Sequence, residues 1–155
     1  MKALKLVVII EICLHILASE EEDLPILDNP KRVFKYMRSR TIGIGVEKFW
    51  MLCLNRKNRL LRVCEATSGT ASNSLVHPRE VFREAIRFGN SAVICVHNHP
   101  SGDPSPSTAD IKVTRQLSDA SNVLGIPILD HVNAGTPKTD PSGLCWYSFQ
   151  DSRML

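Results

Sequence analysis

The stretch SAVICVHNHPSGDPSPSTAD, residues 91–110, decides the fold around it. Its run of Val and Ile predicts a buried strand that ends in His97 and His99. Side chains alternate between the two faces of a strand, so these histidines, two positions apart, point into the same space. The prolines and the glycine that follow cannot continue the strand. They predict a stiff loop that delivers Ser107 and Asp110 to the start of a helix.

Two imidazoles and one carboxylate are a typical three-ligand zinc set that leaves a fourth position open for water. Zinc lowers the pKa of such a water to about 7, and hydrolysis then needs a general base that is not itself a ligand, for which glutamates are natural candidates. A purely structural alternative exists for each part. Histidines at a strand end can face solvent, and the Ser-x-x-Asp spacing of Ser107 and Asp110 is close to a helix capping box.

Composition indicates one soluble globular domain. The chain has 155 residues, 43% of them hydrophobic and 23% charged, which is near the average for such proteins and argues against disorder. A formal net charge of +3, with basic residues spread along the chain, is weak support for a nucleic-acid surface. The 5 cysteines have no C-x-x-C spacing and mostly lie in apolar runs, which favours buried thiols in a reducing compartment.

The amino terminus predicts an apolar helix over residues 2–18 that packs on more than one side. Glu11 and His15 interrupt its apolar run, which argues against a membrane span or a secretion signal. The acidic run at residues 19–23 reads as a solvated linker. We therefore expect a cytoplasmic protein with no membrane partner, divided into an amino-terminal helix and acidic linker at 1–29 and a domain at 30–155.

The rest of the chain alternates helical and strand patterns, with one hairpin. The expected helices cover residues 30–40, residues 78–88 with a stop at Gly89, and residues 107–124 with a stop at Gly125. The expected strands cover residues 47–54 and 59–64, the histidine strand, and residues 126–132 and 146–149. This order predicts an α/β fold of three layers, α-β-α, with a mixed sheet covered on both faces.

The motif His97-x-His99-Pro100 followed by Ser107-x-x-Asp110 resembles the RadC family, a bacterial branch of the JAMM (MPN+) metalloprotease domain. Further segments from about residue 30 to the end are also similar to that family: His77-Pro78-Arg79-Glu80-Val81-Phe82, Gly69-Thr70, Leu124-Gly125-Ile126, Leu129-Asp130-His131-Val132 and Tyr147-Ser148-Phe149. The resemblance implies a JAMM/MPN-like sheet, an architecture like that of cytidine deaminases.

The resemblance also implies roles for individual residues. Zinc would be held by His97, His99 and Asp110, and Ser107 would help to stabilise a tetrahedral oxyanion. The family's upstream glutamate, which takes a proton from the zinc-bound water, matches Glu47. Two other glutamates compete for this role, Glu65 at the end of the hairpin and Glu80 in a helix. His131, after Asp130, is a candidate for supporting the site or touching substrate.

These residues predict a zinc-dependent hydrolase that cleaves a peptide or isopeptide bond in a peptide or protein substrate. The alternative is a non-catalytic or DNA-repair-associated accessory protein with a zinc site. A metal-dependent nuclease or deaminase fits less well, because the His-x-Glu and Pro-Cys-x-x-Cys of zinc deaminases are absent from the sequence. Against the family pattern we expect three departures: the amino-terminal helical DNA-binding-like domain of longer relatives is missing, Asn133-Ala134 stands where relatives are apolar, and the loop at 136–143 is expanded. Substrate and oligomeric state stay open.

Overall fold

The computed structural model describes residues 9–12, 23–68 and 76–155 of the chain. Residues 9–12 are helical, as expected for the amino-terminal segment. However, Ile9, Ile10 and Ile12 are 56%, 50% and 53% exposed, so the burial expected of this helix is not found at these positions. The rest of the segment 2–18, most of the acidic run and the Gly69-Thr70 pair lie outside the described residues.

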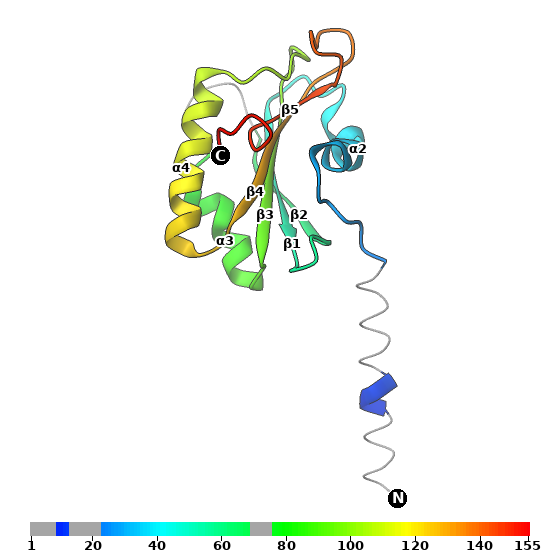
Figure 1. Cartoon of the computed structure of the whole chain (residues 1–155), viewed down its shortest axis with the longest axis vertical. Helices are drawn as coiled ribbons and strands as arrows, with labels where there is room; N and C mark the ends of the chain where they lie inside the picture. The colour runs from blue at the N-terminus through cyan, green and yellow to red at the C-terminus, as the bar shows by residue number, and fades with distance from the viewer. Residues whose placement is uncertain (1–8, 13–22, 69–75) are drawn as a thin grey trace, which may run out of the picture.

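The described chain folds into a mixed sheet with helices on both faces (Figure 1). The elements in order are α2 (Pro30–Thr41), β1 (Lys48–Leu54), β2 (Leu60–Ser68), α3 (Pro78–Phe88), β3 (Ala92–Asn98), α4 (Thr108–Leu124), β4 (Ile128–Ala134) and β5 (Trp146–Ser148). The 5 strands lie in the order β2-β1-β3-β4-β5. β3 and β4 are parallel, and the other neighbours are antiparallel. Figure 1 shows α2 on one side of the sheet and α3 with α4 on the other. The three-layer α/β architecture expected from the sequence is confirmed.

Local sequence signals begin and end the helices. Asn29 caps α2 by accepting a hydrogen bond from the Arg32 N–H at 2.9 Å, and Pro30 follows at the first helical position, where its missing N–H matters least. Gly89 and Gly125 close α3 and α4 in the left-handed conformation, with φ of 62° and 66°. These boundaries match the expected ones closely.

One strand starts later than the sequence predicts. The apolar run from Ile126 was expected to be a strand over residues 126–132, but β4 spans Ile128–Ala134. Ile126 instead takes part in capping the end of α4, because its N–H donates to the Ser121 carbonyl at 3.2 Å. Pro127 has no N–H to give to a ladder. The shift places His131 inside the strand and not at its end.

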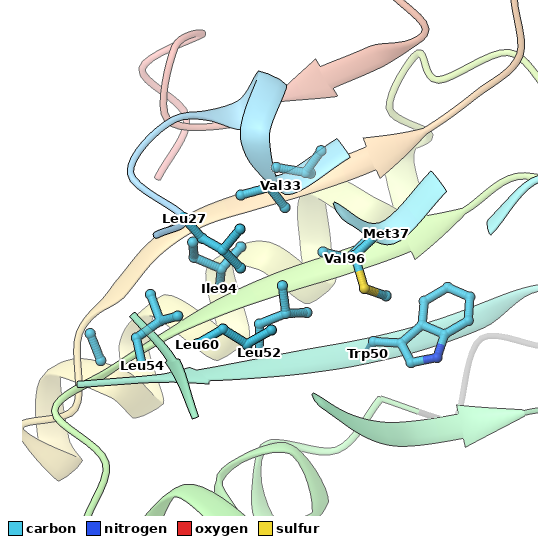
Figure 2. Close-up of a cluster of buried hydrophobic side chains, with 11 residues drawn as sticks. Leu27, Val33, Met37, Trp50, Leu52, Leu54, Leu60, Ile94 and Val96 are labelled. Carbon is cyan, nitrogen blue, oxygen red and sulfur yellow. The ribbon is translucent and has the colours of Figure 1, made fainter. Parts of the chain in front are cut away.

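Strand alternation divides the core between the two faces of the sheet. On the α2 face, Trp50, Leu52 and Leu54 of β1 pack with Val33 and Met37 of α2 (Figure 2). On the other face, the alternate β1 residues pack with the central strand and the two covering helices, through Phe49, Met51, Cys53, Val81, Phe82, Ala85, Val93, Cys95 and Leu117. Both faces of the sheet are buried at β1 and β3, which explains why these strands are almost continuously apolar.

The cysteines of the described chain behave as the sequence predicts. Cys53 and Cys95 are buried, Cys64 and Cys145 are partly buried, and all four are free thiols. Burial raises the pKa of the Cys53 thiol to about 12, so it stays protonated and inert at neutral pH. Within the described residues, no helix has the length and apolar character needed to cross a membrane.

Candidate metal centre

His97, His99 and Asp110 come together where β3 ends and α4 begins. Each offers one ligand atom, and these atoms lie within 4.8 Å of one another. Nδ1 of His97 is 3.2 Å from Oδ1 of Asp110, and Nε2 of His99 is 3.1 Å from Oδ2. The two rings meet edge to face, with centroids 4.9 Å apart. The triad that the sequence singled out is therefore one compact cluster of two nitrogens and a carboxylate, the donor set that zinc accepts.

The helix start holds the Asp110 carboxylate in place. The Ser107 backbone N–H donates to Oδ2 of Asp110 at 2.7 Å, and the Asp110 N–H donates to Oγ of Ser107 at 3.1 Å, which together make a capping box. Burial alone would raise the pKa of Asp110, but hydrogen bonds from His97, His99 and the Ser107 N–H outweigh it and lower that pKa. The carboxylate is thus ionised and oriented, so the capping and ligand interpretations are compatible.

The backbone carbonyl of Asp103 orients the His99 ring. Its Nδ1 lies 2.6 Å from the backbone carbonyl of Asp103, and because a carbonyl only accepts, Nδ1 carries the proton. Nε2 is the ring nitrogen that faces Asp110, at 3.1 Å from Oδ2, and it is the atom that would bind a metal in exchange for a proton. Burial tends to lower the pKa of His99, but the contacts with Asp110 and Asp103 and the charge of Glu47 raise it overall.

Glu47 lies on the same face as the histidines, at the entrance of β1. The antiparallel register pairs Phe49 with His97 and Lys48 with Asn98, so the next position brings Glu47 opposite His99. Its charge acts on the His99 ring, raising that ring's pKa. Glu47 is only partly buried. The catalytic role of Glu47 stays a prediction.

The two competing glutamates have other partners. Oε1 of Glu65, on the hairpin, forms an ion pair with Nζ of Lys48 at 2.9 Å. Glu80, on the first turn of α3, pairs with Arg79 at 3.2 Å and with Arg83 at 2.9 Å. Neither contributes to the metal-binding cluster found among the described residues.

Ser107 combines a cap with an available proton. Its Oγ accepts the Asp110 N–H, which uses a lone pair and leaves the hydroxyl proton free to donate elsewhere. The residue is exposed, so an incoming carbonyl oxygen has access to it. The oxyanion role of Ser107 stays a prediction.

His131 is buried in β4 and contacts the cluster indirectly, through Thr114. It is 1% exposed and stacks on Phe149, with ring centroids 4.7 Å apart and planes at 8°. Its Nδ1 lies 2.7 Å from Oγ1 of Thr114, and that hydroxyl donates to the Asp110 carbonyl at 2.7 Å. Burial lowers the pKa of His131 to about 3, so the ring is neutral. It reaches the main chain of Asp110 through Thr114, not the metal-facing carboxylate.

Sequence reasoning missed two polar side chains that complete this arrangement. Thr114 lies four residues after Asp110, on the same face of α4, and that spacing was the available signal. Asn133 is a polar residue inside an apolar strand, 0% exposed, and its Nδ2 lies 3.4 Å from Oδ2 of Asp110. The substitution Asn133-Ala134 therefore leaves β4 intact and places an amide beside the carboxylate.

The loop that follows β4 packs on the metal loop. Thr136 donates its N–H to the Gly102 carbonyl at 2.7 Å. A Cβ on Gly135 would collide with the Gly102 carbonyl and with Pro104, and a Cβ on Gly102 would collide with Thr136 and Thr139. Gly102 also has a φ of +82°, which favours glycine. The segment 136–143 thus braces the turn between His99 and Ser107.

Comparison with known proteins agrees with this architecture. A family model described as a RadC-like JAB domain matches residues 27–153. A UPF0758 protein of Symbiobacterium thermophilum is 48% identical over 109 residues, which cover 70% of this chain and 47% of that protein. A UPF0758 protein of Desulfitobacterium hafniense is 40% identical over 134 residues, covering 86% of this chain and 59% of the relative. One of Chlorobium phaeovibrioides is 45% identical over 129 residues, covering 83% and 55%. The chain spans about half the length of these curated relatives.

Proposed function

Since the chain belongs to the RadC-like JAB domain family, we propose that it is a zinc-dependent hydrolase that cleaves a peptide or isopeptide bond. The observation that carries the proposal is the clustering of His97, His99 and Asp110, whose ligand atoms lie within 4.8 Å of one another. Asp110 is 6% exposed, and its ionised carboxylate is held by hydrogen bonds in a buried site, where a bound cation would add to its stabilisation. These three side chains would hold the ion.

The donor set fits zinc in its chemistry. Two imidazole nitrogens and one carboxylate oxygen leave a coordination position for solvent, and the contact of Nδ1 of His99 with the Asp103 carbonyl leaves Nε2 as the nitrogen that would face the ion. When bound, zinc supplies a Lewis acid that polarises a carbonyl and makes water acidic near neutral pH. The remaining chemistry falls to side chains of the protein.

Glu47 is assigned the role of general base. It takes a proton from the attacking water and returns it to the leaving amine as the C–N bond breaks. Support comes from the β1–β3 register, which brings Glu47 opposite His99, and from its electrostatic effect on that ring. A base that is not a ligand stays free to carry the proton in both directions.

Ser107 is assigned to the oxyanion. Its hydroxyl proton is not used by the helix cap, so it can donate to the oxygen that becomes negative as the tetrahedral intermediate forms. The same side chain fixes the first turn of α4, which also holds Asp110. One residue would thereby link the charge-stabilising donor to a metal ligand.

The proposal is tested by measuring metal content and hydrolysis together. Purified chain is assayed for bound zinc by elemental analysis and for cleavage of internally quenched peptides and of an ε-lysyl isopeptide. We expect His97→Ala and Asp110→Ala to lose both zinc and hydrolysis. Glu47→Gln should keep zinc and lose hydrolysis by about 10²- to 10⁴-fold, the usual contribution of general acid–base catalysis.

Glu65→Gln is the matched control, because it makes the same chemical change on the hairpin and should leave both measurements near wild type. Hydrolysis that persists without metal, or full activity in Glu47→Gln, would contradict the mechanism. Zinc binding with no cleavage of any probe would instead favour the accessory-protein alternative.

A further inference from the structure

Asn98 stands between the two histidine ligands in the sequence, and its side chain meets the backbone around Glu47. The residue is 1% exposed. Strand alternation places its side chain on the α2 face, opposite to His97. The Lys48 N–H donates to Oδ1 of Asn98 at 2.8 Å, and Nδ2 of Asn98 donates to the Val46 carbonyl at 3.0 Å.

These two hydrogen bonds hold both peptide groups that flank the Cα of Glu47. The Val46 carbonyl belongs to the peptide group before Glu47, and the Lys48 N–H belongs to the one after it. Peptide groups are planar, so the backbone of Glu47 has only its φ and ψ angles free. One side chain that binds both groups restrains both angles and so directs the Cα–Cβ bond of Glu47.

We propose that Asn98 is a positioning residue that orients Glu47 relative to the metal ligands His97 and His99. The inference rests on the proposed function, in which Glu47 is the general base. It adds that the base and the ligands are linked through a single residue of β3, whose neighbours on either side are the two histidines. Movement of the Glu47 backbone away from the cluster then strains or breaks these hydrogen bonds.

A carboxamide suits this role because it presents one acceptor and one donor side by side. The partners assign the roles without ambiguity: the Lys48 N–H can only donate, and the Val46 carbonyl can only accept. Asp at this position keeps the acceptor and loses the donor. Leu has nearly the same shape and loses both. Both bonds lie in a part-buried setting, where water replaces them poorly.

The first test measures amide hydrogen exchange in the metal-free full chain, which needs no substrate. In Asn98→Leu we expect the Lys48 amide to exchange at least about tenfold faster, because its protecting acceptor is gone. Asn90→Leu is the matched control, since it makes the same change at a buried asparagine two residues before β3 begins. It should leave Lys48 protected. Unchanged protection of Lys48 in Asn98→Leu would overturn the inference.

The second test is a double-mutant cycle on zinc-loaded protein, with the quenched ε-lysyl isopeptide as the probe. Asn98→Leu should lower kcat by about 100-fold, the effect of misplacing a reacting group by about 1 Å, with KM and zinc affinity unchanged. In the Glu47→Gln background the same substitution should cost nothing further, because the group it orients is absent. Equal losses in both backgrounds, or loss of zinc, would overturn the inference.

Asn98→Asp guards against a folding defect in the leucine variant. It keeps the bond to Lys48, so the Lys48 amide should stay protected while kcat falls for want of the donor to Val46. Wild-type kcat in this variant would overturn the role given to the donor. Full activity in Glu47→Gln would remove the base assignment of the proposed function instead, and the exchange measurement would still decide whether Asn98 restrains the backbone around Glu47.

Discussion

Thr114 joins His131 to the metal-binding cluster. Its Oγ1 lies 2.7 Å from Nδ1 of His131 and 2.7 Å from the Asp110 carbonyl, to which it donates. A hydroxyl has one proton, so His131 must donate from Nδ1 and leave Nε2 without a proton. Nε2 is buried and has no hydrogen-bond partner among the described residues. The ring therefore serves here through its Nδ1 proton and its stacking.

Replacement of Thr114 by valine should weaken both folding and metal binding. The shape is kept, but Nδ1 of His131 and the Asp110 carbonyl lose their shared partner, at a cost of about 1–3 kcal/mol in the free energy of unfolding. Zinc affinity should fall by about tenfold, since the first turn of α4 carries Asp110. Denaturant titration and a competing chelator measure the two effects. Thr114→Ser keeps the hydroxyl and should behave much like wild type; equal losses in both variants would contradict this account.

The loss of folding stability at acid pH should depend on His131. In the folded chain burial lowers its pKa from 6.5 to about 3, while the unfolded chain takes up a proton near the ordinary value. Between these two values only the unfolded chain is protonated, so the free energy of unfolding should fall as the pH drops through this window. His131→Phe keeps a ring against Phe149 and cannot titrate. Urea titrations of metal-free protein should show a shallower decline in this variant.

Asp130 affects the pH dependence of stability in the opposite direction to His131. Wild type must therefore be compared with His131→Phe. Burial raises the pKa of its carboxyl from 3.8 to about 6, so the folded chain binds more protons in that range and is stabilised as the pH falls. Because Asp130 is present in both proteins, the difference between wild type and His131→Phe isolates the histidine. An acid decline equally steep in the two proteins would contradict the assignment.

Ser107 should show separable structural and chemical roles. Ser107→Gly should cost only a few tenths of a kcal/mol in stability, because glycine is tolerated as an N-cap, whereas Ser107→Ala should cost about 1 kcal/mol. Both lack the hydroxyl proton and should lose about 10²- to 10³-fold in kcat, as expected for one oxyanion donor. Ser107→Thr keeps a hydroxyl and should keep both the stability and the kcat near wild type. Thermal unfolding measures the capping role and isopeptide hydrolysis measures the oxyanion role. A wild-type kcat in Ser107→Gly would rule out the oxyanion role.

Zinc should stabilise the folded chain by mass action. At a free concentration of about 100 times the dissociation constant, the gain is about 2.7 kcal/mol, visible as a rise in Tm that a chelator reverses. Asp110→Ala removes a ligand and should abolish the shift, while Glu65→Gln should keep it. A zinc-dependent rise in Asp110→Ala equal to that of wild type would place the ion elsewhere.

Gly135 should tolerate no side chain. A Cβ there meets the Gly102 carbonyl and Pro104, so Gly135→Ala must push the metal loop away, at a cost of about 1–3 kcal/mol, and should weaken zinc binding as well. Gly45→Ala is the control, because no atom lies within 4 Å of the position its Cβ would take. Stability and zinc affinity should both be near wild type in the control. Equal behaviour of the two variants would contradict the packing argument.

Local signals in the sequence determined much of the fold and the metal-binding triad. Caps such as Asn29 and Ser107 and the left-handed glycines act within a few residues, so they can be read without tertiary information. His97 and His99 share a face because strand side chains alternate. Such reasoning was less reliable at Ile126, where a helix end and Pro127 delayed the strand. It also gave no reason to expect half-exposed isoleucines at residues 9–12.

The tertiary structure alone decided which distant residues meet the triad. The family resemblance favoured Glu47 as the base, but residue chemistry alone did not separate it from Glu65 and Glu80. The β1–β3 register brought Glu47 opposite His99, while ion pairs engaged the other two. The contacts of Asn98 with Val46 and Lys48 likewise join positions about fifty residues apart. Spacing along the chain specifies neighbours on one helix or strand, whereas strand pairing depends on burial over the whole sheet.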